Sequence, residues 1–372
     1  MIGKLAYRNI IGAGFRTWLN VFILSLVYFG IIALQGLFSG WQQEASRQIK
    51  EWDIAGGQYW HENYDPYDPF SYDESHSVIP EDLIKDIETK NAIPILLTPA
   101  TVYSEGRMQN IVLKGIDVDQ TLLKIPTQYL SEDLEQLNAI IGSRMAKNMK
   151  LHKGDYVTVR WRDKNGTFDA IDVKIAYIFQ TSVLTVDNNQ IWIALKPLRK
   201  MLDMPDEASI IVVKDETNNA SYPGWERKSL NFLLQDLNSM IQAKTIGSSI
   251  LYILLLFMAL IAIFDTQILS IFRRRKEMGT MMALGMTREK IIQLFTLEGV
   301  LHAILAIFIG AVYGIPLLKY FTKVGMNVGT SADDFGLSGL SEKLYPEYGL
   351  SLIHISEPTR LLSISYAVFC LK

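Results

Sequence analysis

Polar side chains that lie inside long apolar runs are the first candidates for chemistry in this chain. Asp265 interrupts an otherwise uncharged apolar stretch, and a carboxylate in such a place indicates either a function or a hydrogen bond to another helix. Glu298 and His302 are four residues apart, so on a helix they share one face and could pair with each other. One glutamate and one histidine are too few ligands for a metal site.

Motifs of catalytic and cofactor sites are missing from the sequence. It contains no G-x-x-x-x-G-K-[ST] phosphate loop, no nucleophile elbow, no zinc-ligand spacing and no dinucleotide fingerprint. We therefore expect no catalytic, metal-binding or cofactor-binding residues and no enzyme activity. The net charge of -3 predicts no binding of nucleic acid, and the one cysteine, Cys370, excludes an internal disulfide.

Three long apolar segments must position the intramembrane polar residues. They cover residues 17–43, about 246–272 and about 294–320, and a helix that crosses a bilayer needs ~20 such residues. A cleavable signal peptide is the alternative for the first segment, but its apolar region would be shorter and would precede small residues. Gly310 and Gly314 give the third segment a face of small residues suited to close helix packing.

Basic residues predict which ends of these segments are cytoplasmic. Lys4, Arg8 and Arg16 precede the first segment, and the run 273–276 separates the second from the third. Positive residues concentrate on the cytoplasmic side, so we expect the N-terminus and the 273–293 loop to be cytoplasmic. The intervening part, 41–245, would then lie outside, and its 30 acidic and 22 basic residues (30 − 22, a net charge of -8) agree with that orientation.

The outside part alternates short strand-like runs with turn signals, which predicts a mixed α+β domain. Residues 156–161 and 171–175, joined by a turn at 163–166, are typical of a hairpin. Further strands are predicted at 111–116, 191–195 and 210–213, and helices at 80–90, 134–149 and 195–202.

Both ends of this domain carry apolar stripes at helical spacing. Such stripes predict an antiparallel stalk that continues the spans, or two ordinary amphipathic helices that cover a core. Between them, the segment 58–72 is rich in Tyr, Trp, Asp and Pro; it could hold an apolar cargo or a partner, or form a folded surface loop. The stripes are Trp41, Ala45, Ile49 and Trp52 at one end and Leu230, Leu233, Leu237 and Met240 at the other.

Three stretches together resemble the MacB/FtsX-type permease family, whose members include the lipoprotein-releasing permeases LolC and LolE. Residues 5–9 with Arg16-Thr17 are similar to the pattern with which the family opens. Residues 140–146 with Gly154-Asp155 are similar to a pattern of its outside domain. The third stretch is the most specific, because it resembles the family's signature between the second and third spans: 273–279, 283–287 and Glu298-Gly299.

The resemblance implies that a short helix in the 273–293 loop docks on an ATPase subunit. Gly285 is expected to end that helix and Thr287 to cap the next one. The alternative is that the basic run only sets the topology by binding anionic lipid head groups. The implied coupling residues are Arg275, Glu277, Gly279, Ala283, Leu284 and Gly285.

By this resemblance, the chain is a type VII ABC permease without a bound cofactor, and ATP is used by a separate cytoplasmic ABC ATPase. A second permease copy or paralogue, membrane lipid and a periplasmic chaperone or adaptor are the other implied partners, at the bacterial inner membrane. ATP-driven dimer closure would move the outside domain. Lipoprotein release or export, as by LolC and LolE, is the first interpretation. MacB-like efflux and FtsX-like activation of a cell-wall hydrolase are alternatives, and a membrane-anchored periplasmic sensor or binding protein is an alternative of another class.

The final residues do not fit this layout. The family has a fourth span after 321–349, but the apolar run 361–371 is too short for one. Residues 351–360 and 364–372 read as a translated transposon-type sequencing adapter around a variable index, so we expect 350–372 to be non-native, Cys370 included. The predicted order is a cytoplasmic amphipathic N-terminus (1–16), first span (17–40), extracytoplasmic domain with stalk helices (41–245), second span (246–272), coupling segment (273–293), third span (294–320), outside loop (321–349) and adapter read-through (350–372), with the fourth span lost.

Overall fold

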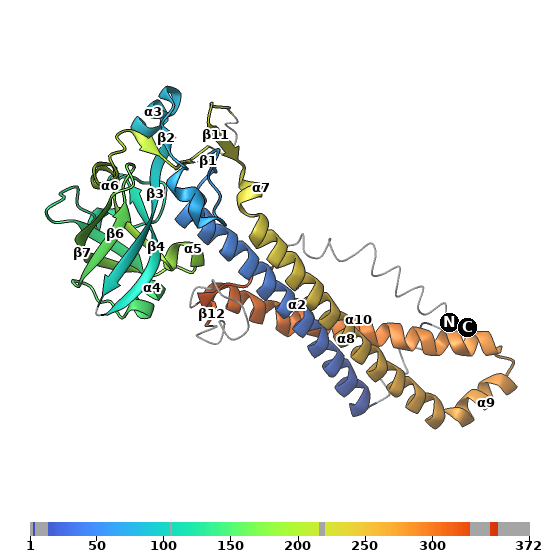
Figure 1. The fold of residues 1–372 in the computed structure, drawn as a ribbon. Coiled ribbons are helices and arrows are strands. Elements are labelled where there is room, and N and C mark those ends of the chain that lie inside the picture. Colours follow the sequence, from blue (N-terminus) through green and yellow to red (C-terminus); the bar gives the residue numbers. More distant parts are fainter. Residues whose placement is uncertain (1–2, 4–13, 105, 216–219, 328–342, 349–372) are drawn as a thin grey trace. The chain divides into compact units, whose positions relative to one another are not determined.

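The computed structural model of the chain divides into a strand-rich unit and a helical unit (Figure 1). The strand-rich unit is built on Gln43–Ser239, and the helical unit on the segments before and after it. The structure describes all residues except 1–2, 4–13, 105, 216–219, 328–342 and 349–372. The predicted N-terminal segment, the outside loop and the adapter tail therefore lie largely outside the described residues.

Long apolar helices make up the helical unit. Among the described residues, three helical segments are long and apolar enough to cross a membrane: Val21–Ile54, Gln235–Met258 and Arg288–Val324. The helices are α2 (Phe15–Ile49, extended by the π-helical turn η1, Lys50–Ile54), α8 (Gln235–Arg273), the short α9 (Arg275–Ala283) and α10 (Arg288–Val324).

Small residues bring α10 close to α2. A Cβ atom on Gly310 would lie 3.4 Å from the Ser25 carbonyl oxygen, and one on Gly314 would lie 3.1 Å from the Phe29 ring. Next to them, the Tyr313 hydroxyl lies 3.2 Å from Ser25 Oγ. The close packing predicted for the small-residue face of the third apolar segment is therefore confirmed. Between α2 and α8, the Lys244 ammonium lies 4.6 Å from the centre of the Trp41 ring.

Strands and short helices alternate through the other unit. In chain order these are β1 (Gln58–His61), η2 (Pro69–Asp73), β2 (Ser77–Val78), α3 (Glu81–Glu88), β3 (Ala92–Ser104), β4 (Arg107–Ile116), η3 (Thr127–Tyr129), β5 (Asn138–Gly142), α4 (Ser143–Met149), β6 (Tyr156–Arg162), β7 (Phe168–Phe179), α5 (Leu184–Asp187), β8 (Gln190–Ala194), α6 (Leu195–Leu202), β9 (Glu207–Ala208), β10 (Ile210–Val213), β11 (Trp225–Lys228) and α7 (Leu230–Leu233). Beyond them, β12 (Met326–Asn327) pairs with β13 (Lys343–Leu344).

One mixed sheet organises these strands. Its order is β11-β1-β10-β3-β4-β8-β5-β7-β6, and β6 also pairs with β3, so six of the strands close into a ring. The long strand β3 makes this closure because its first residues pair with β10, whereas Ala100–Tyr103 pair with β6. Most neighbours are antiparallel, but β4 with β8 and β5 with β7 are parallel.

Alternate residues of the central strands supply two apolar cores. Ile141 and Ile193 belong to the core that α4 and α6 cover. Ile140 and Trp192, their chain neighbours, belong to the core of the opposite face, against which Ile49 and Trp52 pack. Because neighbouring residues of a strand point to opposite faces, burial of both faces explains why these strands are continuous apolar runs.

The predicted elements of this unit are confirmed with one exception. The hairpin corresponds to β6 and β7, and the strand predicted at 210–213 and the helix predicted at 195–202 have the bounds of β10 and α6. The helix predicted at 134–149 is wrong in its first half. Residues Asn138–Gly142 form β5, which pairs with β7 and β8, and the helix begins only at Ser143. Both faces of β5 are buried, so its apolar run carries no strand-like alternation.

Candidate functional site

A short helix and a tight turn connect α8 to α10. The backbone leaves helical geometry at Arg274 (φ -98°, ψ 15°), and α9 starts at the next residue. At its end, Gly285 has φ +89°, its N–H donates to the Met282 carbonyl, and the Met286 N–H donates to the Met281 carbonyl, both at 3.0 Å. This pair of bonds is a Schellman motif, which needs a residue with positive φ at the position of Gly285. The prediction that Gly285 ends the helix is confirmed.

The start of α10 differs in part from its prediction. Thr287 is the N-cap residue of α10, with extended backbone angles (φ -71°, ψ 153°). Its side chain, however, makes no capping hydrogen bond, so the predicted position is right and the predicted bond is wrong. The turn between α9 and α10 is therefore held by the main-chain hydrogen bonds of Gly285 and Met286 and not by a side-chain cap.

Arg274 fastens the start of α9 to α10. Its Nε donates to Glu277 Oε2 at 2.7 Å, and its Nη1 donates to Glu298 Oε1 at 3.2 Å. The guanidinium also lies 5.6 Å from the centre of the Phe295 ring. The Glu298 side chain is only 5% exposed, so this ion pair is largely shielded from solvent, whereas Glu277 is exposed. A guanidinium can serve both carboxylates because it carries five N–H donors in a fixed plane.

The predicted pairing of the Glu298 and His302 side chains is wrong. His302 Nδ1 lies 2.6 Å from the main-chain carbonyl oxygen of Glu298, while the carboxylate of Glu298 accepts from Arg274. The sequence prediction missed Arg274 because four consecutive basic residues offered equivalent partners. The spacing of three residues between Arg274 and Glu277 was the one local signal for it.

Asp265 lies on an exposed part of α8. Within the described part of the chain, the hydrogen bond to another helix that the sequence favoured is not found. The surrounding side chains Ile261, Phe264 and Leu269 are exposed and apolar. The carboxylate therefore belongs to a face of the helix that the described residues leave exposed.

All six residues implied in coupling are exposed on α9 and its turn. Leu284 has 85% of its surface exposed, and Met282, two residues before it, is 52% exposed. At Gly279, a Cβ atom would meet no other atom within 4 Å. An apolar tip beside basic residues on a helix fixed at both ends is suited to binding another protein. The six are Arg275, Glu277, Gly279, Ala283, Leu284 and Gly285.

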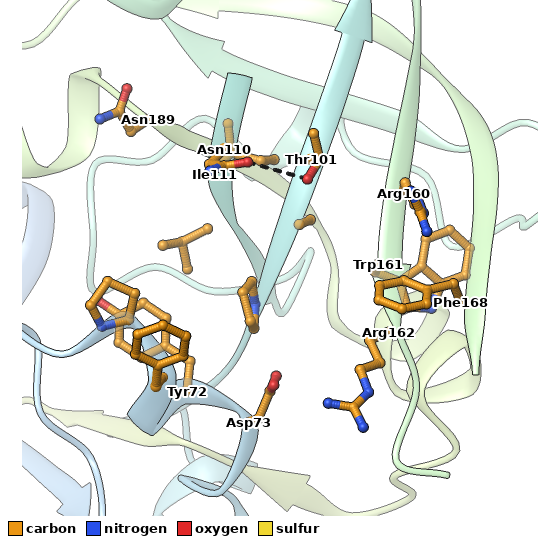
Figure 2. Close-up of a pocket in the computed structure, with 15 residues that line it drawn as sticks. Tyr72, Asp73, Thr101, Asn110, Ile111, Arg160, Trp161, Arg162, Phe168 and Asn189 are labelled. Atoms are coloured by element: carbon orange, nitrogen blue, oxygen red, sulfur yellow. Dashed lines mark hydrogen bonds between the residues drawn. The ribbon is translucent and has the colours of Figure 1, made fainter. Parts of the chain in front are cut away.

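A groove of about 680 Å³ crosses one face of the sheet in the strand-rich unit. Figure 2 shows Tyr72 and Asp73 at one side of the groove and the strand hairpin that carries Arg160 and Arg162 at the other. Between them, the Thr101 hydroxyl donates to Asn110 Oδ1 at 3.3 Å, and Arg160 covers the Phe168 ring at 4.3 Å. The groove is open, its lining mixes apolar and polar side chains, and its charged groups are exposed. In the described segments, no group of three or more His, Cys, Asp or Glu residues could hold a metal ion.

Residues 249–341 match the model of the FtsX-like permease C-terminal domain, a stretch that contains α9 and its turn. A comparison with curated protein sequences gives no match. The periplasmic region of MacB from Actinobacillus actinomycetemcomitans is similar at a TM-score of 0.32 and 11% identity, over 51% of this chain and 95% of that one. The extracellular domain of the noncanonic ABC-type transporter YknZ from Gram-positive bacteria is similar at 0.28 and 16%, over 49% of this chain and 94% of that one.

Proposed function

We propose, for this member of the MacB/FtsX-like family of ABC transporter permeases, that α9 and its turn dock on a separate cytoplasmic ABC ATPase. The observation that carries the proposal is an exposed apolar tip on a helix whose two ends are fixed. Arg274 holds the start of α9 to α10, and the Schellman turn holds its end. A partner that binds Leu284 and Met282 can therefore move the helices as a body instead of deforming a loop.

The mechanism that follows is mechanical. The ATPase binds and hydrolyses ATP, and this chain supplies the surface that follows its closure. Helix α8 continues unbroken from Gln235 to Arg273, so a displacement next to α9 is carried along its length. This proposal has the N-terminus and α9 on the cytoplasmic side of the bacterial inner membrane and the strand-rich domain outside. A second permease copy or paralogue would complete the transporter and cover the exposed face of α8.

Lipoprotein release or export is the cargo function that we propose first. It is supported by the layout of one early apolar helix, a large domain and no phosphate loop in the chain. A periplasmic chaperone or adaptor would then receive the cargo, and membrane lipid would surround the helices. MacB-like efflux, FtsX-like activation of a cell-wall hydrolase, and a membrane-anchored sensor without transport remain the alternatives. Release of a triacylated lipoprotein from proteoliposomes, compared with export of an apolar small molecule, separates the first two.

Docking is tested by ATPase association and stimulation. The full chain is co-expressed with candidate ABC ATPases of the same genome, and co-purification and ATP hydrolysis are measured for Leu284→Glu. We expect association to weaken about tenfold and stimulation to be lost, because a charge replaces an apolar contact at the tip. Leu284 is 85% exposed, so the substitution leaves the fold of the chain intact.

The matched control is Met108→Glu, at an exposed position of β4 in the strand-rich domain. We expect this variant to bind and stimulate the ATPase like the unaltered chain. Equal activity of Leu284→Glu and Met108→Glu would disprove docking through α9. The failure of every candidate ATPase to co-purify both with the unaltered chain and with a homologue that has the fourth span would favour the sensor alternative.

A further inference from the structure

A lysine lies inside the apolar face of the sheet in the strand-rich domain. Lys114 is on the central strand β4, next to Leu97 of β3 and Trp192 of β8, and is only 9% exposed. Its ammonium lies 4.9 Å from the centre of the Trp192 ring. Among the described residues it has neither a hydrogen-bond partner nor a carboxylate within 4.0 Å. A buried cation without a partner is costly, and a ring face compensates for only part of that cost.

Lys114 lines a cavity of about 380 Å³, which we call the Lys114 cavity. Gln190 lines the same cavity, and its Oε1 is buried without a hydrogen-bond partner. Residues 112 and 190 are paired on β4 and β8, so Lys114 and Gln190 are diagonal neighbours on one face of the sheet. A cation and a hydrogen-bond acceptor, neither with a hydrogen-bond partner among the described residues, therefore line the same cavity.

Aromatic side chains form another part of the wall. Trp60, Tyr64, Tyr67 and Tyr72 line the cavity, and all four belong to the aromatic segment 58–72. The rings of Trp60 and Tyr64 pack edge to face at 5.0 Å, and those of Tyr64 and Tyr72 stack at 5.7 Å. Part of this segment is therefore a folded wall and not an open loop, and it offers ring faces to a flat apolar body.

Two carboxylates restrict the charge that the cavity can accept. Asp53 accepts a hydrogen bond from the Thr185 hydroxyl at 3.4 Å, and Asp236 accepts one from the Tyr67 hydroxyl. Burial lowers the pKa of Lys114, and the nearby Asp53 opposes this effect. A ligand with one negative charge can pair with Lys114, whereas the second charge of a dianion would add to the repulsion from Asp53 and Asp236, which line the same cavity.

We propose that the Lys114 cavity binds a small aromatic monocarboxylate. The ammonium of Lys114 holds the carboxylate by donating hydrogen bonds to it, and the rings of the aromatic segment pack against the body of the ligand. The cavity lies within the strand-rich domain, and the inference does not depend on docking of α9 to an ATPase. It makes the outside domain a receptor for a soluble acid.

Binding is measured on the full chain in detergent micelles by saturation-transfer NMR and calorimetry, with empty micelles as the blank. Phenylacetate is the probe, phenylacetamide is its neutral isostere, and phenyl phosphate is the dianion. We expect phenylacetate to bind at millimolar concentration or below, and each of the other two to bind at least about tenfold more weakly. Equal binding of acid and amide, tighter binding of the phosphate, or no binding of the acid would overturn the proposal.

The decisive variant is Lys114→Met, which keeps the length of the side chain and removes its charge. We expect phenylacetate affinity to fall about tenfold or more, while the thermal unfolding of the domain is unchanged or occurs at higher temperature. Lys196→Met is the control, because Lys196 is exposed and paired with Glu132 on the surface of the same domain. Unchanged affinity in Lys114→Met would contradict the proposal. If that variant does not fold, the comparison of acid with amide on the unaltered chain decides.

Discussion

The two units of this chain differ in how far they expose their apolar side chains: the strand-rich domain buries them, and the long helices expose many of them. In the strand-rich domain, Leu113 and Ile141 are fully buried, whereas Leu254 and Phe257 of α8 are each more than half exposed. Water cannot surround a helix with so many exposed apolar groups, so the helical unit needs lipid or further helices around it. The domain, by contrast, buries its apolar residues in cores of its own.

Two buried charges, one in each unit, differ in whether a partner holds them. Glu298 of the helical unit is held by Arg274, as expected where no solvent can compensate a charge. Lys114 of the domain has no such partner among the described residues and faces a cavity. The first charge serves the structure of the chain, and the second is available to a ligand.

The largest effect is expected from one substitution made in each unit. Leu113→Ala removes a fully buried side chain, so the domain should lose about 3–4 kcal/mol of its unfolding free energy through lost burial and a cavity. Leu254→Ala, on the exposed face of α8, should change stability by less than about 1 kcal/mol in micelles. Thermal unfolding of the purified chain, followed by near-UV circular dichroism, measures both. Similar losses would show that the contrast in burial has no energetic meaning.

A smaller loss is expected from breaking the ion pair of the helical unit. Arg274→Gln leaves the shielded carboxylate of Glu298 without its cation and should cost about 2–3 kcal/mol. The double variant with Glu298→Gln should recover most of this loss, because no unpaired charge remains. Glu277→Gln is the control and should cost only about 0.5 kcal/mol, since that carboxylate is exposed. Far-UV circular dichroism during heating follows the helices, and equal effects of the two single variants would contradict a special role for Glu298.

Local patterns in the sequence predicted much of the fold. The turn at 163–166 between two alternating runs identified the β6–β7 hairpin, and Gly285 identified the end of α9. Closure of the strand ring could not be predicted, because it depends on pairs such as Ala100 with Trp161 that lie far apart in the chain. Local chemistry determines turns and helix ends, whereas strand order depends on the whole core.

The candidate site was predictable in part. Motifs in a continuous stretch of chain identified α9 and its turn, and the docking role implied for the six residues there stays a prediction. Arg274 was missed because its role depends on Glu298, which lies on another helix. Lys114 was missed because a lysine in a strand ordinarily faces solvent, and only the packing of both faces of the sheet buries it.

The smallest expected effect is a loss of stability at low pH, and it should be confined to the strand-rich domain. Glu207 accepts hydrogen bonds from Lys164 at 2.7 Å and His76 at 2.5 Å. Burial raises the pKa of Glu207, but these bonds and charges outweigh it, so its pKa is lowered from the ordinary value of 4.5. A carboxylate with a lowered pKa stabilises the folded state above its unfolded pKa, and this contribution is lost as pH falls through the folded pKa.

The melting temperature of the domain should therefore fall between about pH 5 and pH 3, while the far-UV signal of the long helices persists. Glu207→Gln should cost about 1 kcal/mol at pH 7 and should make the decline with acid shallower. Asp187→Asn is an informative control, because burial raises the pKa of Asp187, and its ionisation therefore opposes folding as pH rises. Asp187→Asn should make the melting temperature fall more steeply as the pH is lowered, whereas Glu207→Gln should make it fall less steeply. A parallel response of the two variants, or acid unfolding of the helices together with the domain, would contradict the separation between a self-sufficient domain and a helical unit that depends on its surroundings.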